Sequence, residues 1–238
     1  MERSEGPDVF PHAEDIRAFA QAPFDTLRAG RTRRGPELAR PKDAPWYPVP
    51  VMEIRPVQAA DLPDLSEIDG TVESSEYLHL ERISAEGLSV AWKLEERPLR
   101  EARRERNRLG DDAEFVLKQI ASGADEGLAL LAEHEGQKVA MLLAQPQPQY
   151  GTLRVVDLRV DFDYRREGLG QALLFQAINH ARDLELRAVT AETRTDNIPA
   201  ARLLSKCGFE IAGVDTHRHS NHDLVKEVAS LLWYAALD

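Results

Sequence analysis

The strongest constraint on the fold is a strand-like run that is followed directly by a glycine-rich turn and a helical pattern. Residues 152–160 (TLRVVDLRV) alternate and are rich in valine and leucine, which favours a strand. In the next stretch, 163–170 (DYRREGLG), two glycines lie only two positions apart. Apolar residues then recur one helical turn apart over 169–184. Together with the strand and helix patterns elsewhere, this unit predicts a mixed α/β sheet.

The glycine-rich turn is suited to binding an anion. Glycine lets backbone N–H groups approach a ligand closely. Such groups converge at a helix N-terminus, where the helix dipole adds partial positive charge. Arg165 and Arg166 supply further donors. We therefore expect a phosphate or pyrophosphate here, although the chain has a formal net charge of -11.

Two common phosphate-binding motifs are absent from the sequence. The full G-x-G-x-x-G pattern is missing, and no acidic residue ends a strand about 20 residues later, as dinucleotide binding would require. The Walker A pattern G-x-x-x-x-G-K-[ST] is missing too. The expected cofactor therefore belongs to another class of phosphate-bearing molecules.

Strand and helix patterns continue on both sides of this unit. We predict further strands over 51–57, 88–94, 127–133, 138–145, 188–193, 209–216 and 228–237. We predict helices over 59–68, 99–109, 113–121 and 198–206. The stretch 99–109 is interpreted as a solvated helix or helical connection because Glu101 and Glu105 each lie one turn from an arginine.

The first fifty residues differ from the rest of the chain. They hold eight of the fourteen prolines, and their apolar residues have no sustained period. We expect residues 1–50 to be a Pro- and Arg-rich, partly irregular extension, and residues 51–238 to be the functional domain. A basic contact with RNA through this extension is the less favoured alternative to a solvated tail.

Composition limits the setting and the partners. Cys207 is the single cysteine, so no intramolecular disulfide can form and a reducing cytoplasm is the expected location. We find no secretory signal, and no apolar run approaches the roughly 20 residues of a membrane span. The acidic balance argues against nucleic-acid or anionic-membrane binding and is compatible with amine-bearing partners.

Two sequence blocks resemble one enzyme family. Residues 165–170 (RREGLG) match the R-x-x-G-x-G/A signature of the Gcn5-related N-acetyltransferases (the GNAT family). Residues 197–200 (NIPA) and 206–209 (KCGF) are similar to that family's N-x-x-A…K-x-G-F block. The stretch 157–215 looks especially like the streptothricin-type acetyltransferases. The resemblance covers roughly residues 51–238.

The resemblance implies a fold and a cofactor. The fold would be a mixed, mostly antiparallel sheet with a splayed central strand pair and helices on both faces, the acyl-CoA N-acyltransferase fold. The cofactor would be acetyl-CoA, with its pantetheine arm held by backbone groups of Leu158, Arg159 and Val160. The loop would take the pyrophosphate through Arg165, Arg166, Glu167, Gly168, Leu169 and Gly170. Asn197 would contact the cofactor from the start of the next helix.

Acetyl transfer to an amine needs a base, and two carboxylates are candidates. Asp157 is preferred because strand alternation places it with Val155 and Arg159 on one face, where desolvation would suit a base. The equally weighted alternative is that Asp157 pairs with Arg159 or Arg154, or only binds the substrate amine. Glu192 is the second candidate, against an ion pair with Arg194 or Arg187.

The acid that protonates the leaving thiolate is not evident. Many relatives carry a tyrosine where this chain has Leu204. Tyr164 and Tyr234 are alternative donors, for which packing roles are favoured. Cys207, at a helix end, is expected to be structural rather than nucleophilic.

Three histidines occur in one polar segment, at His217, His219 and His222. Their spacing fits no strong metal motif and no second ligand cluster supports one, so no metal is expected. The default interpretation is a loop between the last two strands, which in this fold borders the acceptor cleft. A second segment with Glu73, Glu76, Tyr77 and His79 either recognises the acceptor or is ordinary surface.

We therefore predict a cytoplasmic acyltransferase that moves an acetyl group from acetyl-CoA directly to a primary amine of a small molecule. A protein amine acetyltransferase and a non-catalytic acyl-CoA-binding sensor are the alternatives. The sequence leaves the identity of the acceptor and the oligomeric state open, a homodimer included.

Overall fold

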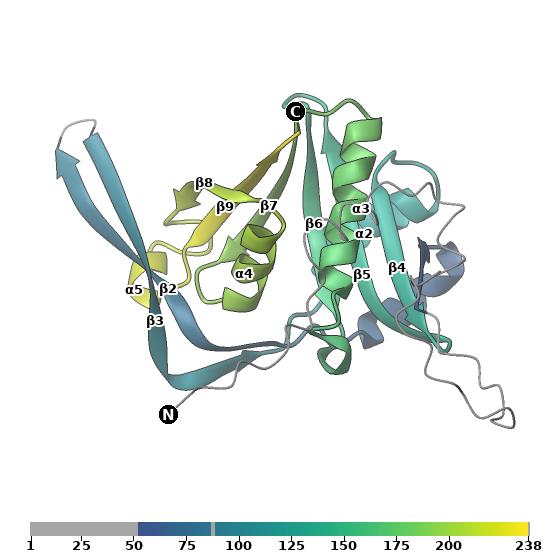
Figure 1. Cartoon of the computed structure of the whole chain (residues 1–238), viewed down its shortest axis with the longest axis horizontal. Helices are drawn as coiled ribbons and strands as arrows, with labels where there is room; N and C mark the ends of the chain where they lie inside the picture. The colour runs from purple at the N-terminus through teal and green to yellow at the C-terminus, as the bar shows by residue number, and fades with distance from the viewer. Residues whose placement is uncertain (1–51, 87–88, 238) are drawn as a thin grey trace, which may run out of the picture. The chain divides into compact units, whose positions relative to one another are not determined.

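A seven-stranded sheet organises the chain, in the order β1-β4-β5-β6-β7-β9-β8 (Figure 1). The computed structural model describes residues 52–86 and 89–237; the predicted extension 1–50 lies outside these residues. All neighbouring strands run antiparallel except β6 and β7, which are parallel. The strands are β1 (Glu53–Pro56), β4 (Leu128–His134), β5 (Gln137–Gln147), β6 (Thr152–Val160), β7 (Ala188–Arg194), β8 (Glu210–Asp215) and β9 (Ser230–Ala236). This confirms the predicted mixed, mostly antiparallel sheet.

Helices cover both faces of the sheet, as predicted. On one face, α3 (Leu169–Asp183) and α4 (Ile198–Lys206) bury an apolar stripe that includes Leu173 and Leu204. On the other, the 3-10 helix η2 (Ala59–Glu67) and α2 (Asp111–Ala121) bury Leu65 and Leu117. Two short turns of helix, η3 (Phe162–Tyr164) and α5 (Asp223–Lys226), complete the helical elements of the described residues. None of the helices in these ranges is long and apolar enough to cross a membrane.

A long hairpin joins η2 to α2 and corrects one sequence prediction. It consists of β2 (Val72–Glu86) and β3 (Ser89–Glu105). The predicted helix over 99–109 is wrong, because residues up to Glu105 belong to β3. Glu105 instead lies across from Val72 of β2, and the neighbouring Arg104 lies across from Glu73. A solvated two-stranded hairpin accepts charge on both faces, so the charge pattern does not separate the two structures.

The base of this hairpin is fixed closely against the sheet. A Cβ on Gly70 would lie 2.6 Å from the backbone oxygen of Asn107, so only glycine allows the two chain segments to approach this closely. The same oxygen accepts a hydrogen bond from Nη1 of Arg159 on β6, at 3.4 Å. Residues that enter and leave the hairpin are thereby held beside the central strands.

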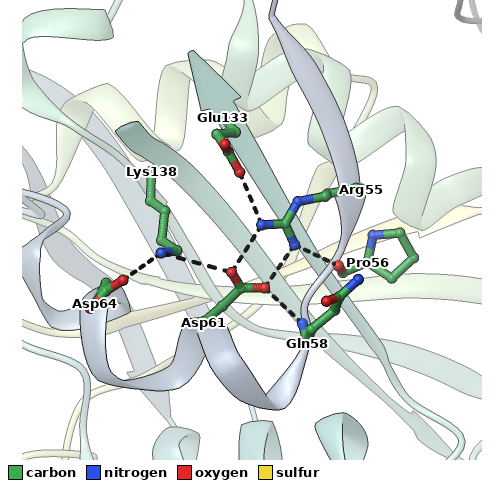
Figure 2. Close-up of polar contacts among 7 residues, drawn as sticks. All are labelled: Arg55, Pro56, Gln58, Asp61, Asp64, Glu133 and Lys138. Atoms are coloured by element: carbon green, nitrogen blue, oxygen red, sulfur yellow. Dashed lines mark hydrogen bonds and ion pairs between the residues drawn. The ribbon is translucent and has the colours of Figure 1, made fainter. Parts of the chain in front are cut away.

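An ion-pair cluster ties η2 to the sheet edge (Figure 2). The guanidinium of Arg55 on β1 donates to both carboxylate oxygens of Asp61, at 2.7 and 2.9 Å, and to Glu133 on β4, at 2.9 Å. Lys138 on β5 adds a bond of 2.6 Å to Asp64. The Arg55 hydrogen bonds lower the pKa of Asp61 to about 2, which keeps this buried carboxylate ionised.

Candidate active site

The centre of the sheet opens between β6 and β7. These strands pair only at 152–154 with 188–190, and Figure 1 shows them diverging beyond that end. The splayed strand pair implied by the family resemblance is therefore confirmed. An open strand edge leaves backbone donors and acceptors available to a ligand.

A β-bulge at Val156 sets which side chains of β6 face which side. Val155 pairs with Ala144, but the next partner pair along the strands is Asp157 with Leu143, so Val156 is the extra residue. Val155 consequently packs with the core under α3, whereas Val156 packs with the core under η2 and α2. The prediction that Val155 shares a face with Asp157 is wrong, because the bulge reverses the alternation.

A pocket of about 320 Å³ occupies the opening on the side of the hairpin base. Its walls come from β6, β7, the hairpin base, the start of α4 and the segment before β9. The lining is mostly polar and charged, and includes Arg154, Glu192, Asn197, His219 and Ser230. Small-molecule sites in proteins commonly start at about this volume.

The predicted anion site lies at the start of α3, where the backbone is open. Gly168 precedes the helix with φ of 84°, a left-handed conformation that favours glycine. A Cβ built on Gly168 would meet nothing within 4 Å, so the backbone here faces open space. The N–H groups of residues 168–171 have no acceptor among the described residues, and the first helical turn holds no acidic side chain. These are the conditions for anion binding at a helix N-terminus.

Arg165 holds the shape of this turn. Its Nε donates to the backbone oxygen of Val160 at 3.0 Å, and its Nη2 donates to that of Asp69 at 3.2 Å. The guanidinium also lies 5.1 Å from the ring centre of Phe162. Arg165 therefore joins the end of β6 to the segment before the hairpin, and backbone N–H groups remain the principal donors toward a ligand.

The other predicted cofactor residues are placed around the same opening. Leu158 and Val160 are half-buried against the core under α3, and the side chain of Leu169 is buried, so their backbones supply the hydrogen-bonding groups at these positions. Gly170 lets α3 approach α4, because a Cβ there would lie 3.0 Å from Cδ2 of Leu203. Asn197 caps α4, its Oδ1 accepting from the N–H of Ala200 at 3.2 Å, and it also lines the pocket. The structure places Arg166 (φ 68°) and Glu167 in the turn before Gly168.

Asp157, the preferred base, is bound by Arg159. Nε and Nη2 of Arg159 donate to the two carboxylate oxygens, each at 2.7 Å. The side chain of Arg159 is 2% exposed and that of Asp157 is 13% exposed. Asp157 does not line the described pocket. The pairing that the sequence offered as the alternative is therefore present, and both oxygens are occupied.

Glu192, the second candidate, lines the pocket and keeps one oxygen open. Its Oε1 accepts from Oγ of Ser230 at 2.8 Å and from Nε of Arg218 at 3.2 Å. Among the described residues, no hydrogen bond to Oε2 is present. The predicted pairing of Glu192 with Arg194 or Arg187 does not occur there either, because Arg194 pairs with Asp196 and Glu105 while Arg187 bonds Tyr150 and Tyr234.

Ser230 connects Glu192 to His219. Nε2 of His219 lies 3.1 Å from Oγ of Ser230. A hydroxyl has one proton, which Ser230 donates to Glu192, so the histidine nitrogen must donate to the serine. Asp223, fully buried, accepts from the backbone N–H of His219 at 2.8 Å and holds the loop in place. The three side chains form a hydrogen-bonded chain from the pocket to an exposed imidazole.

The residues considered as a leaving-group acid or a nucleophile lie outside the pocket. The hydroxyl of Tyr164 faces Gln137, and that of Tyr234 accepts from Arg187, so neither lies in the pocket. Leu204 is a core residue under the sheet. Burial raises the pKa of the Cys207 thiol to about 11, which leaves it protonated and unreactive at neutral pH.

The two polar segments singled out in the sequence are placed as follows. The three histidines lie in the connection before α5 and β9, and no group of three or more His, Cys, Asp or Glu suited to a metal occurs in the described ranges. The second segment forms part of β2, outside the lining of the pocket. There Glu76 pairs with Arg202, and Tyr77 is buried with its ring edge-on to His79.

Several pocket residues were missed from the sequence. Arg103, Glu105, Arg106 and Asn107 reach the pocket only because β2 and β3 form a hairpin. Ser230 lies within the range 228–237 that was predicted as a strand, and no motif in the sequence marks it as a pocket residue. Asp196, which precedes the cap residue of α4, is buried and bound by Arg103 and Arg194.

The sequence is similar to known acetyltransferases. The model of the acetyltransferase (GNAT) family matches residues 90–209. The chain belongs to the GNAT family. Streptothricin acetyltransferase A from Bacillus subtilis (strain 168) is 37% identical over 84 residues, which is 35% of this chain and 48% of that protein. Streptothricin acetyltransferase from Escherichia coli is 31% identical over 75 residues, 32% of this chain and 43% of that protein. The match thus spans less than half the length of these curated relatives.

Solved structures of GNAT proteins share the fold over most of the chain. The crystal structure of nourseothricin acetyltransferase superimposes with a TM-score of 0.64 at 18% identity, covering 79% of this chain and 99% of that one. A second crystal structure is that of a Bacillus anthracis str. Ames protein, provisionally described as a streptothricin acetyltransferase and solved with acetyl coenzyme A. It superimposes with a TM-score of 0.63 at 21% sequence identity, covering 79% of this chain and 100% of that one. The family assignment and the predicted fold are confirmed.

Proposed function

We propose that this GNAT protein is an acetyl-CoA-dependent N-acetyltransferase that acts on a primary amine of a small molecule. The observation that carries the proposal is the position of the polar pocket, which lies in the same strand opening as the glycine turn at the start of α3. One part of this opening is suited to a diphosphate and the other to a small polar acceptor. The named streptothricin acetyltransferases among its relatives support an acceptor of this size.

The residues present fit coenzyme A. The unpaired N–H groups of residues 168–171 and the open space beside Gly168 suit its pyrophosphate. The unpaired edge of β6, at Leu158, Arg159 and Val160, suits the amide groups of its pantetheine arm. Asn197, at the start of α4, would border the pantetheine arm as well. When bound, acetyl-CoA supplies an activated acetyl thioester.

We propose Glu192 as the base that accepts the proton of the acceptor amine. Glu192 lines the pocket and its Oε2 accepts no hydrogen bond among the described residues, whereas both oxygens of Asp157 are held by Arg159. Asp157 is better placed to orient Arg159, which bonds the hairpin base at Asn107. Ser230 and His219 hold this carboxylate in position, because Ser230 donates a hydrogen bond to Glu192 and His219 donates one to Ser230.

The chain would not need to supply an acid to the departing thiolate, because a thiolate is a modest base. Leu204 has no proton to give, and no tyrosine lines the pocket among the described residues. Turnover without a phenolic acid is the consequence that we expect.

The proposal is tested by binding followed by turnover. Calorimetric titration with acetyl-CoA should show saturable binding, and release of free thiol should then be measured with a panel of primary amines. Amine-dependent thiol release supports the enzyme. Binding without release on any small amine, but with release on peptides, would favour a protein acetyltransferase. Binding without release on either would favour a non-catalytic sensor.

A further inference from the structure

The charges that line the pocket are unevenly compensated. Asp196 is 5% exposed and lies between two arginines: Arg103 pairs with it, and Arg194 binds it through Nε and Nη2 at 2.9 and 2.6 Å. Arg194 also pairs with Glu105 at 3.2 Å. These four side chains therefore neutralise one another within the protein.

Two other arginines in the lining are not compensated in this way. The side chains of Arg106 and Arg154 line the pocket and make no hydrogen bond or close ion pair with any residue that the structure describes. Arg106 has only the longer-range attraction of Asp69, whose pKa it helps to lower, and Arg154 has no charged partner in these ranges. A guanidinium presents five donors in a planar fork that matches a carboxylate. The pocket therefore offers unsatisfied donors for an anionic group.

The carboxylate of Glu192 lies on the same face of the sheet as Arg154. Arg154 on β6 is directly opposite Thr190 on β7, and Glu192 follows two residues later on that face. Two residues along a strand span roughly 6–7 Å, which the long arginine side chain can bridge. An acidic and a basic group thus flank one small volume.

We propose that the acceptor carries a carboxylate close to its reactive amine, as amino acids do, and that Arg154, assisted by Arg106, binds this carboxylate while Glu192 receives the amine. This inference rests on the proposed function and narrows its substrate class. A polycationic acceptor would instead place positive charge beside Arg154 and Arg106, neither of which has a close ion pair among the described residues, and this disfavours it.

The test compares acceptors that differ in one group. Thiol release is measured with lysine against lysinamide, with β-alanine against its amide, and with streptothricin as a polycationic acceptor. We expect kcat/KM to be at least about tenfold higher for each carboxylate than for its amide, since one charged hydrogen-bonded pair is worth about this factor or more. Equal or lower values for the carboxylates would overturn the inference, as would a preference for streptothricin.

A variant pair assigns the preference to the pocket. Arg154→Gln should bring the carboxylate-to-amide ratio of kcat/KM close to one, and Arg154→Glu should reverse it. Arg182→Gln, on the exposed surface of α3, is the matched control and should keep the wild-type ratio. An unchanged ratio in Arg154→Gln would contradict the assignment. Turnover of amides or streptothricin without a carboxylate preference removes this inference alone, whereas no turnover of any amine removes the proposed function with it.

Discussion

Arg159 holds both carboxylate oxygens of Asp157, each at 2.7 Å, from a position that is 2% exposed to solvent. The pair also reaches the hairpin base through the backbone oxygen of Asn107. The pair therefore has a structural role beside the hairpin base. From the sequence alone, a catalytic role for Asp157 and an ion pair with Arg159 were equally weighted.

Asp157→Asn is expected to destabilise the fold more than it impairs chemistry. It leaves the Arg159 charge buried without its partner, which typically costs about 3–5 kcal/mol of unfolding free energy. Urea denaturation measures this loss, and the double replacement Asp157→Leu with Arg159→Met should recover part of it. Normal stability together with a hundredfold loss of turnover would instead identify Asp157 as the base.

Gly168→Ala is expected to weaken acetyl-CoA binding by about tenfold or more. The left-handed φ of 84° disfavours any Cβ, and a side chain there would hinder approach to the helix N-terminus. Gly123→Ala is the matched control, because Gly123 has a φ of 74° and equally open surroundings at the end of α2. Both variants should lose about 1–2 kcal/mol of stability. Calorimetry should show lost affinity in the first variant only, and equal affinities would argue against the anion site.

Asp61→Asn should lower stability at neutral pH by about 2 kcal/mol, since the pKa of Asp61 falls from 3.8 to about 2 in the folded protein. A depressed folded pKa means that the contribution is complete above pH 4–5 and is lost as pH falls toward 2. Urea denaturation at a series of pH values should therefore show wild type and variant converging in acid. A constant difference down to pH 3 would contradict the ion-pair account. Glu114→Gln, in an exposed pair with Lys118, should change stability by less than about 0.5 kcal/mol.

Ser230→Ala should lower kcat by about tenfold, because Glu192 loses a hydrogen bond that fixes its carboxylate in the pocket. Ser230→Thr keeps the hydroxyl and should keep a kcat near that of the wild type. His219→Ala should slow turnover less than Ser230→Ala, because Ser230 still bonds Glu192. If Ser230→Ala releases thiol as fast as the wild type, the hydrogen-bonded chain does not position Glu192 for the reaction.

The elements around α3 could be predicted because each carries a local signal. The strand at 152–160, the glycines of the turn and the Asn197 cap all encode their structure within a few neighbouring residues. The bulge at Val156 could not be predicted, because it depends on the register with β5. One extra residue was enough to change the face of Val155.

The hairpin was missed for a related reason. Residues 99–105 have the charge spacing of a helix, and only pairing with the distant strand β2 makes them extended. Because the hairpin was not predicted, the positions of Arg103 and Arg106 in the pocket wall were not predicted either. The position of Glu192 on a strand could be predicted because β7 is short and regular, whereas its link to Ser230 requires the long-range pairing of β7 with β9.

The proposed base is tested most directly by Glu192→Gln, which keeps the size of the side chain and removes its basicity. Steady-state thiol release should fall by about 10²- to 10⁴-fold with the best acceptor, while the Kd for acetyl-CoA and the urea midpoint stay near those of the wild type. A variant that retains half or more of the wild-type kcat at neutral pH would contradict the assignment of Glu192 as the base.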